Sequence, residues 1–411
     1  MRQAPTGAIR DVIDFLRGET GFIYTAKARE LSKKGFKVIN FGVGQPDFPT
    51  PRHIVEEAKK ALDDGFTGYT EVAGIPELRQ AIAEYLNERY GSDVKPDEVI
   101  VTPGAKAALF LAFAAYIRPG DEVIVPDPSY YMYPEITKFL GGKPVYVPLK
   151  WLGSERGFEL DVDAIEKAIT SKTRAIVINN PHNPTGALFT SKEISKVLEI
   201  AVDRNILVIV DEIYDNFVYE GDFKSFISFE NWRDYVVYTN GFSKTFSMTG
   251  WRLGYLVVRR EIASRLTKLA VNVWTCAPSF VQRAGVKALK GDWRPVKEMI
   301  ETFRRRRDVM VNELNKIDGV VVWKSRGAFY LYPNIRKVLN ELNMDVETFA
   351  NRLLEEKYIA LLPGTVFSET DFGRDFIRLS FALNEELIVE GINRLKSFID
   401  EHKKLRLYET F

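Results

Sequence analysis

The stretch that decides the fold lies at residues 205–217 and reads NILVIVDEIYDNF. Its unbroken apolar run, Ile206 to Val210, is typical of a central strand in a parallel sheet, because such a strand is buried on both faces. Asp211 follows the run directly. Open α/β sheets bind ligands beyond the carboxyl ends of their strands, so Asp211 is either a binding-site acid or an acid that caps the next turn.

Short β-branched runs alternate with stretches of helical length on both sides of this strand. The runs are VIVT (99–102), EVIVP (122–126), RAIVIN (174–179) and YVVYT (235–239). The alternation continues to about residue 290 and predicts an α/β fold, with a mostly parallel sheet and helices on both faces.

The pattern changes at Asp292, where a long charged helix is predicted. The strands VVWKSRGAFYLYPNI (321–335) and FIRLSFAL (376–383), with a helix between them, then predict a smaller α+β unit. Near the N-terminus, residues 8–35 are predicted to be helical in two pieces. The expected division is an N-terminal segment that belongs to the small domain (1–47), a large domain (48–290) and a small C-terminal domain (291–411).

Composition excludes several classes of protein. The 411 residues include 57 basic and 56 acidic ones, so no basic excess favours binding to nucleic acid or to a membrane surface. Cys276 is the single cysteine, which excludes an intramolecular disulfide and a cysteine-based zinc site. Neither a secretory segment nor a run of about 18 apolar residues is present, so a cytoplasmic protein is expected. No histidine has the spacing of a metal site.

A lysine that suits covalent chemistry lies in residues 238–255, YTNGFSKTFSMTGWRLGY. Lys244 follows an apolar strand candidate and is surrounded by small and hydroxyl residues, and Arg252 comes eight positions later. An amine that attacks a carbonyl needs close approach, little bulk around it and a lowered pKa. The alternative is a surface lysine in a polar loop.

Three further turns follow predicted strands. Gly104, Ala105 and Lys106 begin a helix directly after VIVT, and this turn is either a phosphate site at a helix start or a plain strand-to-helix turn. A tyrosine cluster at 130–133 either belongs to the core or offers a flat face to a planar ring. In PHNPTG, Pro184 fixes the position of Asn183. Gly44 either brings backbone close to a ligand or forms a turn.

These features follow one another along the chain, and together they supply the groups that pyridoxal phosphate (PLP) chemistry needs. A lysine forms the Schiff base, an acid pairs with the pyridinium nitrogen and a helix end holds the phosphate. The sequence resembles the class I/II aminotransferases of PLP fold type I, and within them the aspartate aminotransferase-like branch. The resemblance runs from about Lys27 to Asp400 and is carried by FGVGQPDF, YTEVAGIPELR, PHNPTGA, VDEIYD, GFSKTFSMTGWRLGY, SRGAFY and IRLSFA.

The resemblance implies two catalytic residues. Lys244 matches the Schiff-base lysine, which afterwards moves a proton between the substrate Cα and the cofactor. Asp211 matches the carboxylate that keeps the pyridine nitrogen protonated. Tyr214 and Asn183 match the donors to the phenolic oxygen of the cofactor.

Other residues are implied to hold the cofactor. Tyr130 matches the ring that stacks on the cofactor, with Tyr131 as the competitor for that role. Tyr69 matches a tyrosine that reaches the phosphate of a neighbouring subunit, so a homodimer is implied. Many relatives carry a phosphate-binding serine where this chain has Gly241, and the phosphate contact is expected to shift to Ser243 or to the backbone. The resemblance implies that the rest of the phosphate-binding site is formed by Gly104, Ala105, Lys106 and Arg252.

The substrate site is also implied by the resemblance. Arg378 matches the arginine that binds the substrate α-carboxylate with both guanidinium donors, helped by Asn183 and the amide of Gly44. In the bacterial-type branch, a lysine at the place of Lys106 contacts the distal carboxylate of acidic substrates. The alternative is a lysine that lies near the phosphate or in solvent.

The sequence is therefore expected to encode a PLP-dependent aminotransferase with a ping-pong mechanism. Aspartate or glutamate and 2-oxoglutarate are the favoured substrates. The alternatives are an aromatic, alanine or kynurenine aminotransferase and, further away, a PLP-dependent C–S lyase. A PLP-sensing transcription regulator would need a DNA-binding domain, and fewer than 50 residues precede GVGQPDF.

Overall fold

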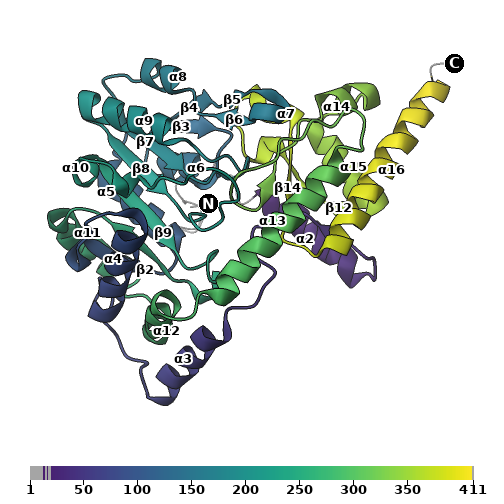
Figure 1. Cartoon of the computed structure of the whole chain (residues 1–411). Coiled ribbons are helices and arrows are strands. Elements are labelled where there is room, and N and C mark those ends of the chain that lie inside the picture. Colours follow the sequence, from purple (N-terminus) through teal and green to yellow (C-terminus); the bar gives the residue numbers. More distant parts are fainter. Residues whose placement is uncertain (1–12, 14–15, 17–19, 410–411) are drawn as a thin grey trace, which may run out of the picture.

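A seven-stranded sheet forms the centre of the protein in the computed structural model, which describes residues 13, 16 and 20–409. Its strand order is β2-β10-β9-β8-β7-β3-β4 (Figure 1). Strand β10 runs antiparallel to both of its neighbours, and the other neighbouring pairs are parallel. The prediction of a mostly parallel sheet is confirmed. The strands are β2 (Val99–Thr102), β3 (Glu122–Asp127), β4 (Lys143–Pro148), β7 (Thr173–Asn179), β8 (Leu207–Asp211), β9 (Val236–Gly241) and β10 (Gly254–Val257).

Helices cover both faces of this sheet because its central strands are apolar on both sides. Val208 and Val210 of β8 face one core and Ile209 faces the other, and all three are fully buried. Complete burial of such a side chain stabilises a fold by about 1.5–3 kcal/mol. The first core includes helices α4 (Pro76–Tyr90), α9 (Ser191–Arg204) and α12 (Ser279–Lys290). The second includes α5 (Ala105–Tyr116), α6 (Met132–Phe139) and α11 (Arg260–Val273).

Smaller elements complete this part of the chain. Helix α3 packs against α12, and the strands β5 and β6 form an antiparallel pair. These elements are α3 (Arg52–Asp63), β5 (Lys150–Trp151), α7 (Gly153–Arg156), β6 (Phe158–Glu159), α8 (Val162–Lys167) and α10 (Trp232–Tyr235).

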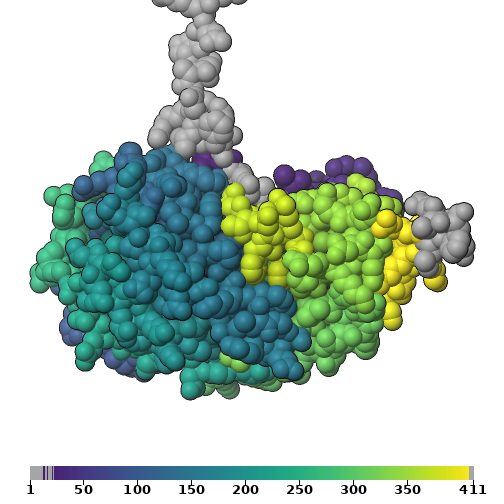
Figure 2. Space-filling model, turned by 90° about the horizontal axis from the view of Figure 1, so that it is seen from above, coloured from purple at the N-terminus to yellow at the C-terminus, as the bar shows by residue number. Residues whose placement is uncertain are grey.

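The C-terminal part of the chain forms a second layer beside the large sheet. Its three-stranded sheet has the order β11-β14-β13, and β12 pairs in parallel with β1 near the N-terminus. The N-terminal residues, drawn in purple, therefore lie on the green and yellow C-terminal part (Figure 2). The elements are α2 (Thr20–Lys33), β1 (Ile39–Asn40), α13 (Arg294–Leu314), β11 (Tyr330–Leu331), α14 (Arg336–Leu342), α15 (Val346–Lys357), β12 (Ile359–Ala360), β13 (Leu362–Pro363), β14 (Ile377–Ser380) and α16 (Glu385–Glu409).

The structure tests two further sequence-based expectations, the helices at 8–35 and the strand at 321–335. Of the two helical pieces predicted for 8–35, the second is α2, and the first lies almost wholly outside the described residues. The long strand predicted for 321–335 is wrong, because only β11 is a strand. The amides of Arg326 and Gly327 donate instead to the carbonyl of Gly186 in the PHNPTG loop, so this backbone is paired outside any sheet.

None of the helices in the described part of the chain is long and apolar enough to cross a bilayer.

Candidate active site

A cavity of about 800 Å³ lies where the carboxyl ends of β7, β8 and β9 face the C-terminal part. Most of the predicted site residues line it. They are Gly44, Ala105, Lys106, Tyr130, Asn183, Asp211, Tyr214, Ser243, Lys244, Arg252 and Arg378. Gly104 lies beside the lining residue Ala105. Tyr69 is 89% exposed and does not line the cavity of its own chain.

Lys244 lies in the turn between β9 and β10 and points into the cavity. Its Nζ donates a hydrogen bond to the carbonyl of Gly44 and lies 5.9 and 5.8 Å from the ring centres of Tyr214 and Phe329. Burial and, after it, the nearby charge of Arg378 lower the pKa of this amine to about 8. About a tenth of the amine is therefore uncharged at pH 7, far more than in an ordinary lysine, and the uncharged form is the one that attacks as a nucleophile.

Asp211 ends β8 and is buried beneath Lys244. Its Oδ2 accepts a hydrogen bond from the Tyr133 hydroxyl at 2.8 Å, and its Oδ1 accepts one from the Ile213 amide at 3.1 Å. Burial raises the pKa of Asp211 to about 6, against the lowering effects of these bonds and of Lys244. A cation near this carboxylate would favour its ionised form.

Asn183 and Arg378 belong to one hydrogen-bonded chain that starts at β7. The Asn179 side chain donates to the Asp211 carbonyl at 2.8 Å, and its Oδ1 accepts from the Asn183 amide at 2.7 Å. The Oδ1 of Asn183 then accepts from Nη1 of Arg378 at 3.0 Å. Nη2 of Arg378 donates to the Gly42 carbonyl at 2.9 Å. These bonds fix the position of the guanidinium group.

The buried Nε of Arg378 has no hydrogen-bond partner among the described residues. The guanidinium lies between two rings, with its carbon 4.2 Å from the centre of the Tyr330 ring and 4.7 Å from that of Phe367. Its burial lowers the pKa of Arg378, but an arginine stays charged at any physiological pH. A buried cation with an unused donor is a ready site for a carboxylate.

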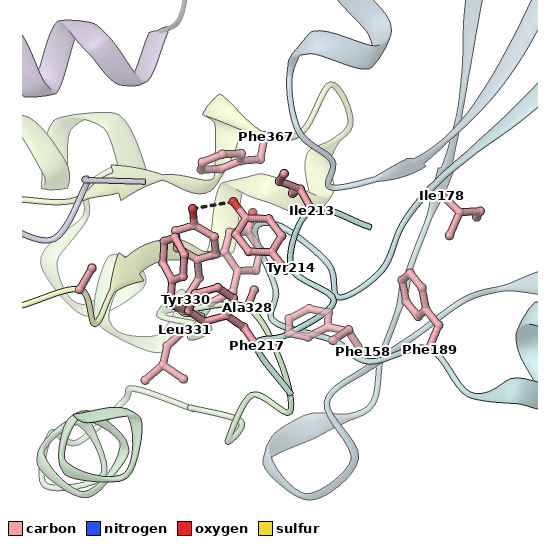
Figure 3. Close-up of a cluster of buried hydrophobic side chains, with 14 of the residues drawn as sticks. Phe158, Ile178, Phe189, Ile213, Tyr214, Phe217, Ala328, Tyr330, Leu331 and Phe367 are labelled. Atoms are coloured by element: carbon pink, nitrogen blue, oxygen red, sulfur yellow. Dashed lines mark hydrogen bonds between the residues drawn. The ribbon is translucent and has the colours of Figure 1, made fainter. Parts of the chain in front are cut away.

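Tyr330 and Tyr133 are site residues that the sequence did not reveal. Tyr330 comes from β11, and its hydroxyl lies 2.9 Å from that of Tyr214 (Figure 3). A Cβ on Gly44 would lie only 3.2 Å from the same Tyr330 hydroxyl, so the glycine allows close backbone approach. Tyr133 belongs to the tyrosine cluster, but nothing in the sequence predicts that its hydroxyl bonds to Asp211.

The turn from β2 into α5 is shaped for an anion. Gly104 precedes α5 with φ 88°, and a Cβ there would lie 2.3 Å from Nη2 of Arg252. Arg252 is held by a bond from Nη1 to the Thr249 carbonyl at 2.9 Å. The first amides of a helix lack intrahelical partners and lie at its positive end. Together with the guanidinium they suit a phosphate group.

Lys106, in the first turn of α5, is held by the tyrosine cluster. Its Nζ donates to the Tyr131 hydroxyl at 2.9 Å and lies 5.7 and 5.4 Å from the ring centres of Tyr130 and Tyr131. The two tyrosine hydroxyls are 3.3 Å apart. Lys106 therefore places a positive charge at the cavity wall.

Gly241 ends β9, at the position where the resemblance leads one to expect a phosphate-binding serine. A Cβ at this position would lie 3.1 Å from the Cα of Gly254, which is tight for any side chain. Ser243, two residues later, is buried and lines the cavity. The packing of β9 on β10 thus gives a physical reason for the glycine.

A second buried network lies behind Lys244. Oδ2 of Asp215 accepts from the Tyr90 hydroxyl at 2.6 Å and from Asn240 at 3.0 Å, and Oδ1 accepts from Asn216 at 2.8 Å. Asn216 also donates to Thr245 Oγ1 at 3.2 Å. These bonds connect the loop after β8 to the end of β9 and to Thr245, the residue that follows Lys244.

The site can therefore attack a carbonyl with a lysine amine, hold a phosphate at a helix start and bind a carboxylate at a buried arginine. In the described part of the chain, no group of three or more His, Cys, Asp or Glu side chains is arranged to hold a metal ion. A lysine amine in this setting has the properties that Schiff-base formation with a carbonyl compound requires.

Comparison with known proteins identifies the family. The family described as aminotransferase class I and II matches residues 37–395. The aspartate aminotransferase of Sulfolobus acidocaldarius is 51% identical over 387 residues, which are 94% of this chain and 96% of that protein. The aspartate aminotransferase of Sulfurisphaera tokodaii is 52% identical over 386 residues, again 94% and 96% of the two chains.

Solved structures agree with this assignment. The crystal structure of the aspartate aminotransferase of Thermotoga maritima has a TM-score of 0.88 at 38% identity, and the match covers 95% of this chain and 100% of that chain. The chain therefore belongs to the class I and II aminotransferases, and the resemblance carried by its motifs is confirmed.

Proposed function

We propose that this aminotransferase uses PLP to move an amino group between an amino acid, with aspartate or glutamate favoured, and a 2-oxo acid, 2-oxoglutarate, by a ping-pong mechanism. The observation that carries the proposal is one cavity in which Lys244, Asp211 and Arg378 converge. The aspartate aminotransferase relatives support the choice of substrate, since they match nearly the full length of the chain.

The residues present fit PLP at each of its charged groups. Lys244 would hold the aldehyde carbon, Asp211 the pyridine nitrogen, and Arg252 with the start of α5 the phosphate. Tyr214 and Asn183 are within the same cavity for the phenolic oxygen. When bound, PLP supplies an electron sink for the electrons released when a bond at the substrate Cα breaks.

The chain's own residues do the remaining work. Lys244, with its lowered pKa, accepts and returns a proton at the substrate Cα because its uncharged form is accessible near neutral pH. Asp211 would keep the pyridine nitrogen of the bound cofactor protonated, because its carboxylate would accept a charge-assisted hydrogen bond there. Arg378 binds the substrate α-carboxylate with its unused Nε, and Asn183 keeps the guanidinium in place.

Lys106 is proposed to select acidic side chains. Its ammonium group is at the cavity wall, where the tyrosine cluster holds it, and a distal carboxylate would pair with it. The alternative role of Lys106 is a contact with the cofactor phosphate alone. Such a contact would give the enzyme no preference among amino acid substrates.

We further propose a homodimer in which Tyr69 completes the phosphate site of the partner subunit. The 89% exposure of Tyr69 supports this proposal, because so exposed a tyrosine is available for an intermolecular contact. We also propose that residues 48–290 form a large domain and that 1–47 and 291–411 form a small one. The pairing of β1 with β12 supports that division.

A half-reaction screen tests the function. The PLP-loaded protein is mixed with single amino acids, and the loss of the cofactor's absorbance band is followed by stopped flow. Aspartate and glutamate should react fastest. An absence of reaction with either, while another amino acid reacts, would contradict the substrate assignment.

Lys106→Ala provides the matched variant for this screen. We expect the apparent Kd for aspartate to rise by about tenfold or more, and that for alanine to change by less than about twofold, because alanine has no distal carboxylate. Equal losses for the two amino acids would remove Lys106 from the specificity argument.

A further inference from the structure

The buried carboxylate of Asp127 ties the segment that carries Phe367 to the large sheet. Asp127 is the last residue of β3 and is 1% exposed. The segment belongs to the C-terminal part and lies between two short 3₁₀ turns, Gly364–Val366 and Asp371–Asp375. Val366 and Phe367 line the cavity.

Asp127 accepts hydrogen bonds from three successive residues of this segment. Its Oδ2 accepts from Ser368 Oγ and from Thr370 Oγ1, each at 2.6 Å, and its Oδ1 accepts from the Glu369 amide at 3.1 Å. Burial raises the pKa of this carboxyl, whereas the three bonds lower it. The Ser129 amide adds a backbone bond to the Phe367 carbonyl at 2.8 Å.

This connection bears directly on the proposed carboxylate site. The ring centre of Phe367 lies 4.7 Å from the guanidinium carbon of Arg378, and that of Tyr330 lies 4.2 Å from the same carbon. Phe367 thus forms one wall of the place where an incoming carboxylate would meet Nε. The hydrogen bonds with residues 127–129 therefore fix the backbone around Phe367.

We propose that Asp127 is a positioning residue for the substrate site, which holds residues 367–370 against β3 so that Phe367 stays on Arg378. The inference deepens the proposed function and rests on it for the role of Arg378. A carboxylate suits this task because it accepts several hydrogen bonds at once, and hydrogen bonds to a charged group are stronger than those between neutral groups.

The test compares Asp127→Ala and Thr370→Val with Asp371→Ala. Asp371 lies next to Thr370, but its carboxylate is 83% exposed and pairs with Arg374, so its loss controls for removal of a local charge. In the PLP-loaded enzyme, Asp127→Ala should raise KM for aspartate by about tenfold and change kcat by less than about threefold. Thr370→Val should act in the same direction but less strongly, and Asp371→Ala should have no effect.

Amide hydrogen exchange supplies a readout that does not depend on the substrate. Peptides covering 366–373 should exchange at least about tenfold faster in Asp127→Ala than in the wild type, and Asp127→Asn should restore part of the protection. Unchanged exchange in this segment, or a loss confined to kcat, would overturn the proposal. If Asp127→Ala does not fold, Thr370→Val decides by the same two measurements. Failure of the wild type to use aspartate would refute the proposed function and leave the exchange result standing.

Discussion

The chemistry of a single lysine depends on which groups surround its amine. Lys244 is close to two aromatic rings, a backbone carbonyl and the buried cation Arg378, whereas its acidic neighbour Asp211 has itself a raised pKa. Burial and the neighbouring positive charge both disfavour the ammonium form. The lowered pKa is therefore a property of the cavity rather than of the local sequence.

A pH dependence of cofactor capture follows from this pKa of about 8. The uncharged amine is the attacking form, so the rate at which cofactor-free protein captures PLP at Lys244 should rise about tenfold per pH unit below pH 8 and level off above it. Timed borohydride quenching and quantification of the modified peptide measure this rate. A rate that continues to rise up to pH 10.5 would show an ordinary lysine, and Lys244→Ala should give no modified peptide.

Also at the residue scale, the site residues that belong to sequence motifs could be predicted from the sequence. Lys244, Asp211, Asn183 and Arg378 were all predicted, and the fold brings them into one cavity. Tyr330 and Phe367 were not predicted as site residues, because an aromatic side chain has the same appearance in a sequence whether it fills a core or lies on an arginine. Their roles arise only from the contact between the C-terminal part and the sheet.

At the scale of elements, the position of the Lys244 turn depends on what is packed behind it. The buried carboxylate of Asp215 collects bonds from α4, from the end of β9 and from its neighbour Asn216. Asn216 in turn reaches Thr245. The loop after β8 and the turn after β9 are therefore joined on the side away from the cavity.

Removal of this carboxylate should loosen the turn. Asp215→Ala leaves the Tyr90 hydroxyl and one side-chain N–H of Asn240 without an acceptor, and each buried unpaired group costs about 1–3 kcal/mol. We expect the free energy of unfolding to fall by about 3 kcal/mol, and kcat to fall more than KM changes, because Arg378 is untouched. Urea unfolding and steady-state kinetics measure the two effects. Tyr90→Phe, which removes one donor, should cost about 1 kcal/mol, and a cost below about 0.5 kcal/mol for Asp215→Ala would contradict this account.

Elements with a clear hydrophobic period were predictable from the sequence. The run 206–210 lies almost entirely in β8, between β7 and β9, because an apolar strand of this kind is stable only where both faces are covered. The strand predicted for 321–335 failed for a different reason. Its residues have strand-like composition, but the backbone around Gly327 bonds to the Gly186 loop, and the sequence holds no signal for such a distant partner.

At the scale of the whole molecule, buried acids make stability depend on pH. Glu212, next to Asp211, is fully buried, and its carboxylate accepts from Ser225 Oγ at 2.6 Å and from the Phe226 amide at 2.9 Å. Burial, with a smaller contribution from the charge of Asp215, nevertheless raises the pKa of Glu212 to about 8. The folded protein therefore binds this proton more tightly than the unfolded chain does.

The sign of the effect on unfolding follows from that difference in proton affinity. The stability that the protonated Glu212 contributes is complete below its ordinary pKa of 4.5 and is lost as the pH rises through about 8. The free energy of unfolding of the cofactor-free wild type should thus fall over this range, by a few kcal/mol at most from Glu212. In Glu212→Gln, which cannot ionise, that part of the fall should disappear. Glu199→Gln, at an exposed position on α9, should keep the wild-type slope, and urea unfolding between pH 5 and pH 8 measures all three. A constant difference between wild type and Glu212→Gln across this range would mean that Glu212 has the same pKa in the folded and unfolded states, and that its burial is fully compensated by its two donors.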